Sequence, residues 1–101
     1  MYYINQGVKN GVGLYKAYAM DKGKKVGYIA GVTHKGELSI CEIETFRGGY
    51  YSGKYGVPPK GTARKMIQSL ITKTKSKKVI ASGVGSPEAR NFWEHMGIKY
   101  R

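Results

Sequence analysis

Apolar and polar residues alternate loosely along three stretches in the first half of the chain, which is the pattern of half-buried strands. The stretches cover residues 11–20, 25–33 and 37–46, and short turns that contain glycine, at 21–24 and 35–36, separate them. Consecutive strands joined by such turns form antiparallel pairs. We therefore expect a three-stranded antiparallel meander.

The third stretch, from Glu37 to Phe46, contains two carboxylates that are close together. If its side chains alternate regularly, one face carries Leu38, Ile40, Glu42, Glu44 and Phe46. The other face then carries Ser39, Cys41, Ile43 and Thr45. Regular alternation thus predicts that Glu42 and Glu44 share a face with the apolar side chains of this strand.

Residues 47–59 break the alternating pattern. Glycines are interleaved here with Tyr50, Tyr51 and Tyr55. Pro58-Pro59 ends any strand ladder, because proline has no N–H to donate. We expect a long loop or a poorly ordered hairpin.

Two helices are predicted in the second half of the chain. From Gly61 onward apolar residues recur at helical spacing, and this helix is expected to end between residues 74 and 77. Ser86 is a good N-cap for the second helix, with Pro87 at its first position and Gly97 as its C-terminal cap. The apolar stripe of the second helix consists of Ala89, Phe92, Trp93 and Met96.

Short strands are expected after each helix, at residues 79–81 and 98–100. The predicted order is strand, strand, strand, loop, helix, strand, helix, strand. This order is typical of an α/β (α+β) domain with a mixed, mainly antiparallel sheet and two C-terminal helices packed on it. Because 101 residues amount to one domain, we expect residues 1–101 to form a single domain.

The composition, 41% hydrophobic and 24% charged, is ordinary for a folded soluble domain. No apolar run approaches the length of a membrane span, and residues 1–6 lack the pattern of a signal peptide. The single cysteine, Cys41, cannot form an internal disulfide, which fits a reducing compartment. We expect a cytoplasmic protein with no membrane partner. Compact chains of this kind also occur in viruses, and a viral protein would act in the host cytoplasm.

The charge is less ordinary than the composition. Eighteen Lys and Arg residues oppose six Asp and Glu residues, which gives a formal net charge of +12. So positive a field attracts polyanions: DNA, RNA, an acidic protein face or the phosphates of a nucleotide cofactor. The alternative is that the lysines only keep a small domain soluble.

Two segments at the right separation resemble the GCN5-related N-acetyltransferase (GNAT) superfamily. Residues 58–67, Pro-Pro-Lys-Gly-Thr-Ala-Arg-Lys-Met-Ile, are similar to the family's acyl-CoA pyrophosphate loop running into a helix. Residues 86–98, Ser-Pro-Glu-Ala-Arg-Asn-Phe-Trp-Glu-His-Met-Gly-Ile, are similar to its Asn-x-x-Ala-x-x-Phe-Tyr-x-x-x-Gly-Phe helix. Residues 25–29 and 38–43 resemble its central hairpin. The resemblance implies a GNAT-like fold, acetyl transfer from acetyl-CoA to a primary amine, and no metal.

The pyrophosphate segment also makes physical sense by itself. Where a helix begins, free N–H groups and the helix dipole form a site for an anion. Gly61 permits close backbone approach, and cations at hand can add charge. The expected cofactor-binding residues are Lys60, Gly61, Thr62, Ala63, Arg64 and Lys65, joined by Ser86. Ser86 stands at the family's Asn position beside the pantetheine arm, and the alternative is that it only caps its helix.

Amine acetylation needs a base, donors for the oxyanion and an acid for the leaving thiolate. In the family a carboxylate on the central strand is the usual base, and Glu42 best matches that place, with Glu44 as second choice. The alternative is that both glutamates are exposed and form ion pairs with nearby lysines. His34, in a turn, is a weaker candidate for the base.

The sequence departs from the family in three places. The family's acid is commonly the Tyr of Phe-Tyr, where this chain has Trp93. Either Tyr50, Tyr51, Tyr55 or Tyr100 substitutes for it, or the thiolate leaves unassisted. Pro58 replaces the first Arg or Gln of the pyrophosphate loop. The chain is also expected to be a short form without the opening strand and the two helices that follow it. This missing wall implies an open cleft, a homodimer or larger assembly that supplies the wall, or a large acceptor.

The tyrosine-rich loop lies where the acceptor approaches in such a fold. Its tyrosines Tyr50, Tyr51 and Tyr55 are the expected acceptor contacts, because aromatic rings stack on bases and also form adaptable protein-binding surfaces. Two other readings stay open beside the enzyme. One is a catalytically inactive GNAT-like basic module that binds nucleic acid or an acidic protein, and the other is a structural subunit of a larger assembly.

Overall fold

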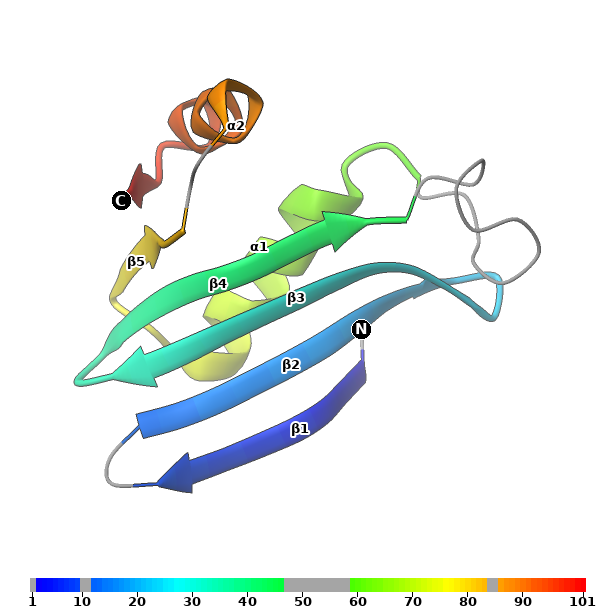
Figure 1. The fold of residues 1–101 in the computed structure, drawn as a ribbon. Helices are drawn as coiled ribbons and strands as arrows, with labels where there is room; N and C mark the ends of the chain where they lie inside the picture. The colour runs from blue at the N-terminus through cyan, green and yellow to red at the C-terminus, as the bar shows by residue number, and fades with distance from the viewer. Residues whose placement is uncertain (1, 10–11, 47–58, 84–85) are drawn as a thin grey trace.

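The computed structural model describes residues 2–9, 12–46, 59–83 and 86–101, with side chains from Val12 onward. These residues form one six-stranded sheet, in the order β1 to β6 along the chain, and two helices (Figure 1). The prediction of a mixed, mainly antiparallel sheet carrying two C-terminal helices is confirmed. The expected loop at 47–59 lies outside the described residues except for Pro59.

The predicted meander is present. Strands β2 (Val12–Asp21), β3 (Lys24–His34) and β4 (Glu37–Thr45) pair antiparallel in sequence order. At each of the two turns a lysine and then a glycine take positive φ, 51° and 76° at Lys22-Gly23 and 50° and 79° at Lys35-Gly36. Positive φ at both central residues is what a tight hairpin turn requires, since it matches the twist of the strands.

The prediction that the chain lacks an opening strand was wrong. Strand β1 (Tyr2–Lys9) pairs antiparallel with β2, from Tyr2 opposite Tyr18 to Lys9 opposite Val12. Only residues 10–11 join these strands, so no helix separates them. The segment escapes a pattern search because its polar residues do not alternate with apolar ones, as befits an edge strand.

The regular alternation predicted for β4 is also wrong, because this strand contains a β-bulge. Ile40 lies opposite Gly31 while Glu42 lies opposite Ala30, so Cys41 is an extra residue without a partner on β3. An extra residue turns every following side chain to the other face of the sheet. Ile43, opposite the fully buried Ile29, therefore takes over the core face. Glu42 and Glu44 are both exposed on the opposite face.

The second half of the chain adds two helix-and-strand units. Helix α1 (Thr62–Thr74) leads to β5 (Lys78–Ala81), and α2 (Pro87–Met96) leads to β6 (Lys99–Tyr100). Each new strand pairs parallel with the strand before it in the sheet. The helix bounds agree with those predicted from the apolar spacing, and Gly97 takes the left-handed conformation that ends α2.

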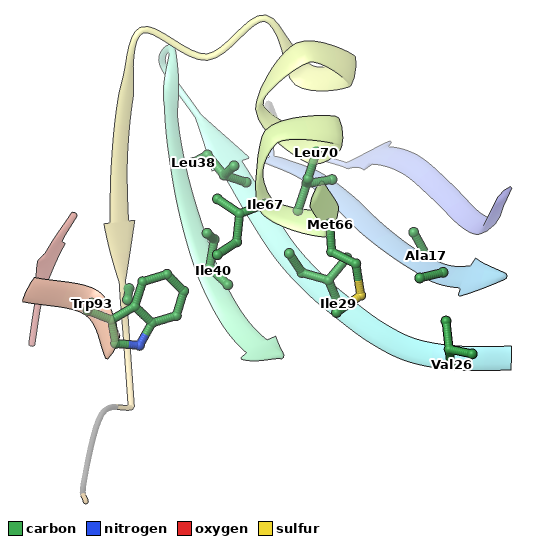
Figure 2. Packing of buried hydrophobic residues seen from close by; sticks show 11 residues of the cluster. Ala17, Val26, Ile29, Leu38, Ile40, Met66, Ile67, Leu70 and Trp93 are labelled. Carbon is green, nitrogen blue, oxygen red and sulfur yellow. The ribbon is translucent and has the colours of Figure 1, made fainter. Parts of the chain in front are cut away.

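One apolar core joins both helices to the sheet (Figure 2). Helix α1 packs on β3 and β4 through Met66, Ile67 and Leu70, all fully buried, and Trp93 of α2, 4% exposed, joins the same cluster. The helix lies close to β3 at Gly27, where an added Cβ would stand 2.8 Å from the methyl carbon of Met66. A larger residue at Gly27 would therefore require the flexible end of the Met66 side chain to move.

Two features are absent from the described part of the chain. No helix there is long and apolar enough to cross a membrane. No three of its His, Cys, Asp and Glu side chains come together in a group that could hold a metal ion.

Candidate functional site

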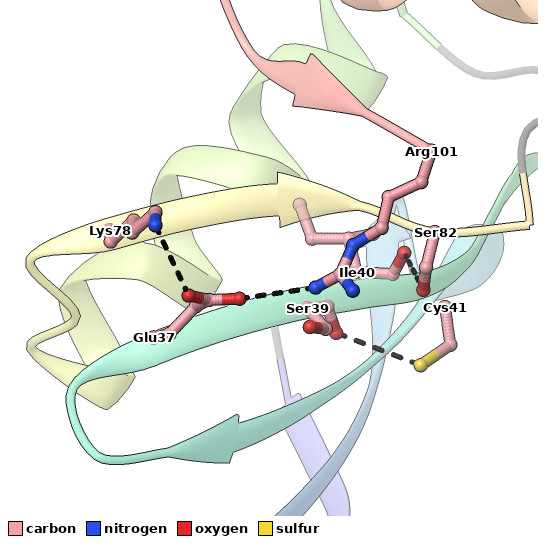
Figure 3. Close-up of polar contacts among 7 residues, drawn as sticks. All are labelled: Glu37, Ser39, Ile40, Cys41, Lys78, Ser82 and Arg101. Atoms are coloured by element: carbon pink, nitrogen blue, oxygen red, sulfur yellow. Dashed lines mark hydrogen bonds and ion pairs between the residues drawn. The ribbon is translucent and has the colours of Figure 1, made fainter.

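Strands β4 and β5 stop pairing halfway along β4. Their pairing runs from Glu37 opposite Lys78 to Ile40 opposite Ala81. The last contact is a pair of hydrogen bonds to the carbonyl oxygen of Ile40, from the N–H of Ser82 at 3.0 Å and from its hydroxyl at 3.4 Å (Figure 3). Beyond this point β4 continues to Thr45 without β5 beside it. Backbone groups on this side of β4 therefore have no strand partner among the described residues.

A cavity of about 350 Å³ occupies the gap between the two strands. Glu42 and Glu44 reach it from β4 and Tyr28 reaches it from β3. Helix α2 closes the other side with Ala89 and Trp93. The remaining lining residues are Ile40, Cys41, Ile43, Ser82 and Gly83. The cavity thus combines an apolar wall with carboxylates, a phenol and free backbone groups.

The two glutamates stand at the exposed side of this cavity. Neither carboxylate makes a hydrogen bond or an ion pair with any residue that the structure describes, so the alternative of glutamates paired with lysines finds no support there. Tyr28 lies directly opposite Glu44 on the neighbouring strand and shares its face. Sequence reasoning missed Tyr28, because the bulge that brings it beside the glutamates cannot be recognised from the order of apolar and polar residues in β4.

A second cavity, of about 390 Å³, lies between the start of α1 and the C-terminal half of α2. Four of the predicted cofactor-binding residues line it, namely Gly61, Thr62, Ala63 and Arg64. The other lining residues are Thr45, Pro59, Phe92, His95 and Met96. The structure therefore brings together most of the residues that the pyrophosphate-loop pattern selected.

The start of α1 is built to leave backbone donors free. Gly61 stands before the helix with φ of +86°, a conformation that residues with a Cβ rarely adopt. Thr62 is buried, and its hydroxyl donates to the carbonyl oxygen of Pro59 at 2.6 Å, which fixes the turn. No side chain caps the helix, and the N–H groups of Ala63 and Arg64 have no backbone partner among the described residues.

The charge at this helix start is uniformly positive. The first turn contains no acidic residue, so the positive end of the helix dipole is not neutralised. Lys60 and Arg64 are both exposed, and Arg64 lines the cavity. Lys65 is also exposed but lines a smaller cavity of about 160 Å³ beside Met20 and Asp21. Free donors, the helix dipole and two cations make the second cavity suited to a phosphate group.

Ser86 and Tyr100 have local roles. The Ser86 hydroxyl accepts a hydrogen bond from the N–H of Ala89 at 3.0 Å and caps α2, while the side chain lines neither cavity. The Tyr100 hydroxyl donates to Glu94 at 2.7 Å, and this hydrogen bond raises the pKa of the phenol. Tyr100 also lies outside both cavities, so it does not replace the family's acid in this arrangement.

His34 is exposed at the end of β3 and lines a hollow far along the sheet from the glutamates. The expected acceptor contacts Tyr50, Tyr51 and Tyr55 lie outside the described residues.

The same two elements, β4 and α2, contribute to both main cavities. Glu44 of β4 and Trp93 of α2 line the first cavity, and their chain neighbours Thr45 and Phe92 line the second. An extended ligand with a phosphorylated end and a thin arm that carries amide groups suits this pair of cavities, with its phosphates at α1 and its amides beside the free edge of β4. Acyl-CoA has that form, and the residues present therefore fit it.

Comparison with known proteins assigns the fold. No family model matches the sequence, and no curated protein matches it. Among solved structures, the ribosomal-protein-alanine N-acetyltransferase from Brucella melitensis biovar Abortus 2308 matches with a TM-score of 0.54 and 15% sequence identity. The match covers 85% of this chain and 62% of the Brucella chain. The chain therefore has a GNAT-like fold, and it spans less than two thirds of that neighbour.

Proposed function

We propose that this protein is an acetyl-CoA-dependent N-acetyltransferase acting on a primary amine of a protein or another macromolecular acceptor. The observation that carries the proposal is the pair of cavities that β4 and α2 both line, one at the start of α1 and one where β4 and β5 separate. One cavity offers an anion site at the start of a helix, and the other offers unpaired carboxylates beside free backbone groups. A GNAT-like fold with such a pair of cavities has what acyl transfer requires.

The second cavity would hold the phosphates. The N–H groups of Ala63 and Arg64 point out of the first turn of α1, and the side chains of Lys60 and Arg64 add charge. Gly61 keeps the approach open, because no heavy atom stands within 4 Å of the place where a Cβ would be. The replacement of the family's first Arg or Gln by Pro58 removes one donor from this site, and Lys60 is the nearest cation to compensate.

The first cavity would hold the reacting groups. Acetyl-CoA supplies a thioester, whose carbonyl carbon accepts the amine. Glu42 is the proposed base that takes a proton from the amine, and Glu44 would attract the cationic form of the acceptor to the same face. Free backbone donors of β4 beyond Ile40 are available to the developing oxyanion. Tyr28 is the proposed source of a proton for the leaving thiolate, in the place of the family's Tyr.

The acceptor would approach from the face of the sheet that bears Glu42 and Glu44. Only residues 10–11 connect β1 to β2, so no helix of that connection covers this face. An open face admits a large acceptor, or a second copy of the chain that completes the wall.

A catalytically inactive module that binds nucleic acid or an acidic partner is the second candidate. Trp93 favours it, because this residue occupies the family's Tyr position as a core side chain, only 4% exposed, and offers no acidic proton. The two functions differ in whether acetyl-CoA binds.

Thermal unfolding with and without acetyl-CoA tests the enzyme proposal through Ala63→Asp. A carboxylate in the first turn of a helix favours the folded state, so the free variant should melt no lower than the wild type. The same carboxylate would repel a pyrophosphate, and the rise in melting temperature on adding acetyl-CoA should disappear. Gln68→Glu is the matched control, because it makes the same charge change on an exposed position of α1 outside the cavity.

In the wild type, acetyl-CoA at about 100 times its Kd would add about 2.7 kcal/mol to the free energy of unfolding. An unchanged melting temperature of the wild type, or an equal rise in Ala63→Asp, would contradict the proposed site.

A further inference from the structure

Lysines gather at the end of the molecule opposite the proposed cofactor site. Helix α1 ends there, next to the turn between β3 and β4 and the start of β5. The N–H groups of Lys77 and Lys78 donate to the carbonyl oxygen of Gly36 at 3.0 and 3.3 Å, which joins the three segments. We call this cluster the basic end. It consists of Lys35, Lys73, Lys75, Lys77, Lys78 and Arg101, all exposed.

Two cations of the basic end share one carboxylate. Glu37 pairs with Lys78 at 3.6 Å and with Arg101 at 3.4 Å (Figure 3). No acidic residue lies on α1 itself. Charge of one sign in so small an area disfavours the folded protein, because like charges repel.

Two of these lysines also occupy unfavourable backbone conformations. Lys75 follows the last turn of α1 with φ of 53° and ψ of 37°, a position where glycine or asparagine is preferred. Lys35 has φ of 50° in a tight turn, where asparagine before glycine is preferred. Folding alone would select other residues at both places. Replacement of Lys35 and Lys75 by the preferred residues would therefore remove charge from the basic end without loss of stability.

The chemistry of the basic end selects one kind of partner. Protein interfaces are depleted in lysine and depend on buried aromatic or apolar anchors. Membrane-binding helices likewise need an apolar face towards the lipid. The exposed surface of the basic end offers neither, since its neighbours on α1 are polar, Thr72 among them. Lysine donors act on phosphate as point charges, and they read no base sequence.

We propose that the basic end binds the phosphate backbone of nucleic acid without regard to sequence. The site is separate from the cofactor cavities, because α1 is 13 residues long and its two ends are about 20 Å apart. Binding of nucleic acid and binding of acetyl-CoA are then independent. This inference stands whether or not the chain is an enzyme.

The test uses a variant that removes two charges and relieves both backbone conformations, Lys35→Asn together with Lys75→Gly. This double variant should melt at the same temperature as the wild type or higher. The matched control is Lys22→Asn with Lys24→Gln at the other end of β3. Lys22 occupies the equivalent turn with φ of 51°, both control lysines are exposed, and the control removes the same charge.

Binding is measured by fluorescence anisotropy with a labelled DNA duplex of about 20 base pairs and its RNA counterpart, at about 0.05–0.3 M KCl. The double variant should bind about tenfold more weakly or worse at 0.1 M salt, and the slope of log affinity against log salt should fall by about two, one per phosphate contact. The control should match the wild type in both. A preference for DNA or RNA identifies the natural source of the phosphates.

Three outcomes would overturn the proposal. The wild type could fail to bind either duplex at low salt. The control could lose as much affinity as the double variant, in which case net charge alone is responsible. Polyglutamate or phosphatidylserine vesicles could bind the basic end more tightly than either duplex, which would assign the surface to a protein or a lipid partner.

Discussion

Glu42 and Glu44 are alike in chemistry, face and exposure, and they differ in position along β4. Glu42 directly follows Cys41, the extra residue of the bulge, at the level where β5 has just separated from β4. Glu44 lies two residues further along, opposite Tyr28. In the proposed reaction a base has to reach the amine beside the thioester, so Glu42, the residue nearer to the point where the strands separate, is the better placed of the two.

The first residue-scale prediction concerns Glu42→Gln. Loss of a general base lowers turnover by about 10²- to 10⁴-fold, whereas the stabilisation by acetyl-CoA should be unchanged, since Glu42 does not line the phosphate cavity. Steady-state acetylation of an amine substrate and thermal unfolding measure the two effects. Glu44→Gln is the matched control and should mainly raise KM. Equal turnover in Glu42→Gln and the wild type would remove Glu42 from the mechanism.

The candidate site is predictable from the sequence where its chemistry is local. Gly61 and Ser86 are recognisable because a tight turn and a helix cap depend on a few neighbouring residues. The face on which Glu42 lies and the position of Tyr28 beside the glutamates cannot be predicted in this way, because both depend on the pairing of β4 with β3. No periodicity within β4 shows that one residue has no partner on β3.

Helices α1 and α2 begin in opposite ways. Helix α2 starts with the capped turn of Ser86, Pro87 at its first position and Glu88 in its first turn. Helix α1 starts with Gly61, without a side-chain cap and without an acid. Each missing device weakens α1 as a helix and leaves donors available. The start of α2 is thus the more stable of the two, and the start of α1 is the one with donors open to an anion.

Removal of the cap in Ser86→Ala should therefore act on stability alone. Loss of an N-cap side chain costs about 1 kcal/mol in the free energy of unfolding, measurable by urea denaturation. Ser86→Asp, which can still cap, should keep the wild-type stability. Affinity for acetyl-CoA should be the same in all three proteins, because the hydroxyl is engaged with Ala89. A weaker affinity in Ser86→Ala at unchanged stability would instead give Ser86 the pantetheine contact.

Most elements of the fold follow from their own sequence. The periodicity of α1 and α2 and the glycine turns of the meander predict those elements within a residue or two. Strand β1 is the exception, and its signal is Asn10-Gly11, a dipeptide typical of two-residue hairpin turns. Pairing with β2, rather than any pattern within residues 2–9, makes this segment a strand.

Charge is the property that belongs to the whole molecule. A net charge of +12 on 101 residues destabilises the compact state by self-repulsion. The two ion pairs shown in Figure 3 join one carboxylate, Glu37, to two cations, and the net positive charge of the molecule remains.

Stability should consequently rise with ionic strength. The Debye length falls from about 30 Å at 0.01 M salt to about 10 Å at 0.1 M, so added salt screens repulsion across the molecule. We expect the melting temperature to increase by a few degrees over this range, with sulfate more effective than chloride at equal ionic strength. A fall in melting temperature with added KCl would mean that attractive pairs outweigh the repulsion.

The bulge at Cys41 has a consequence for how this protein can change over generations. The bulge absorbs the extra residue, so the residues on either side of it pair with consecutive residues of β3. Removal of the codon for the exposed Cys41 would therefore leave Ile43 on the core face and Glu42 and Glu44 on the opposite face, because the same pairs would form in regular alternation. Related chains should accordingly tolerate any residue at this point, or the loss of it, and a chain that lacks it should lose only the local bend of the bulge.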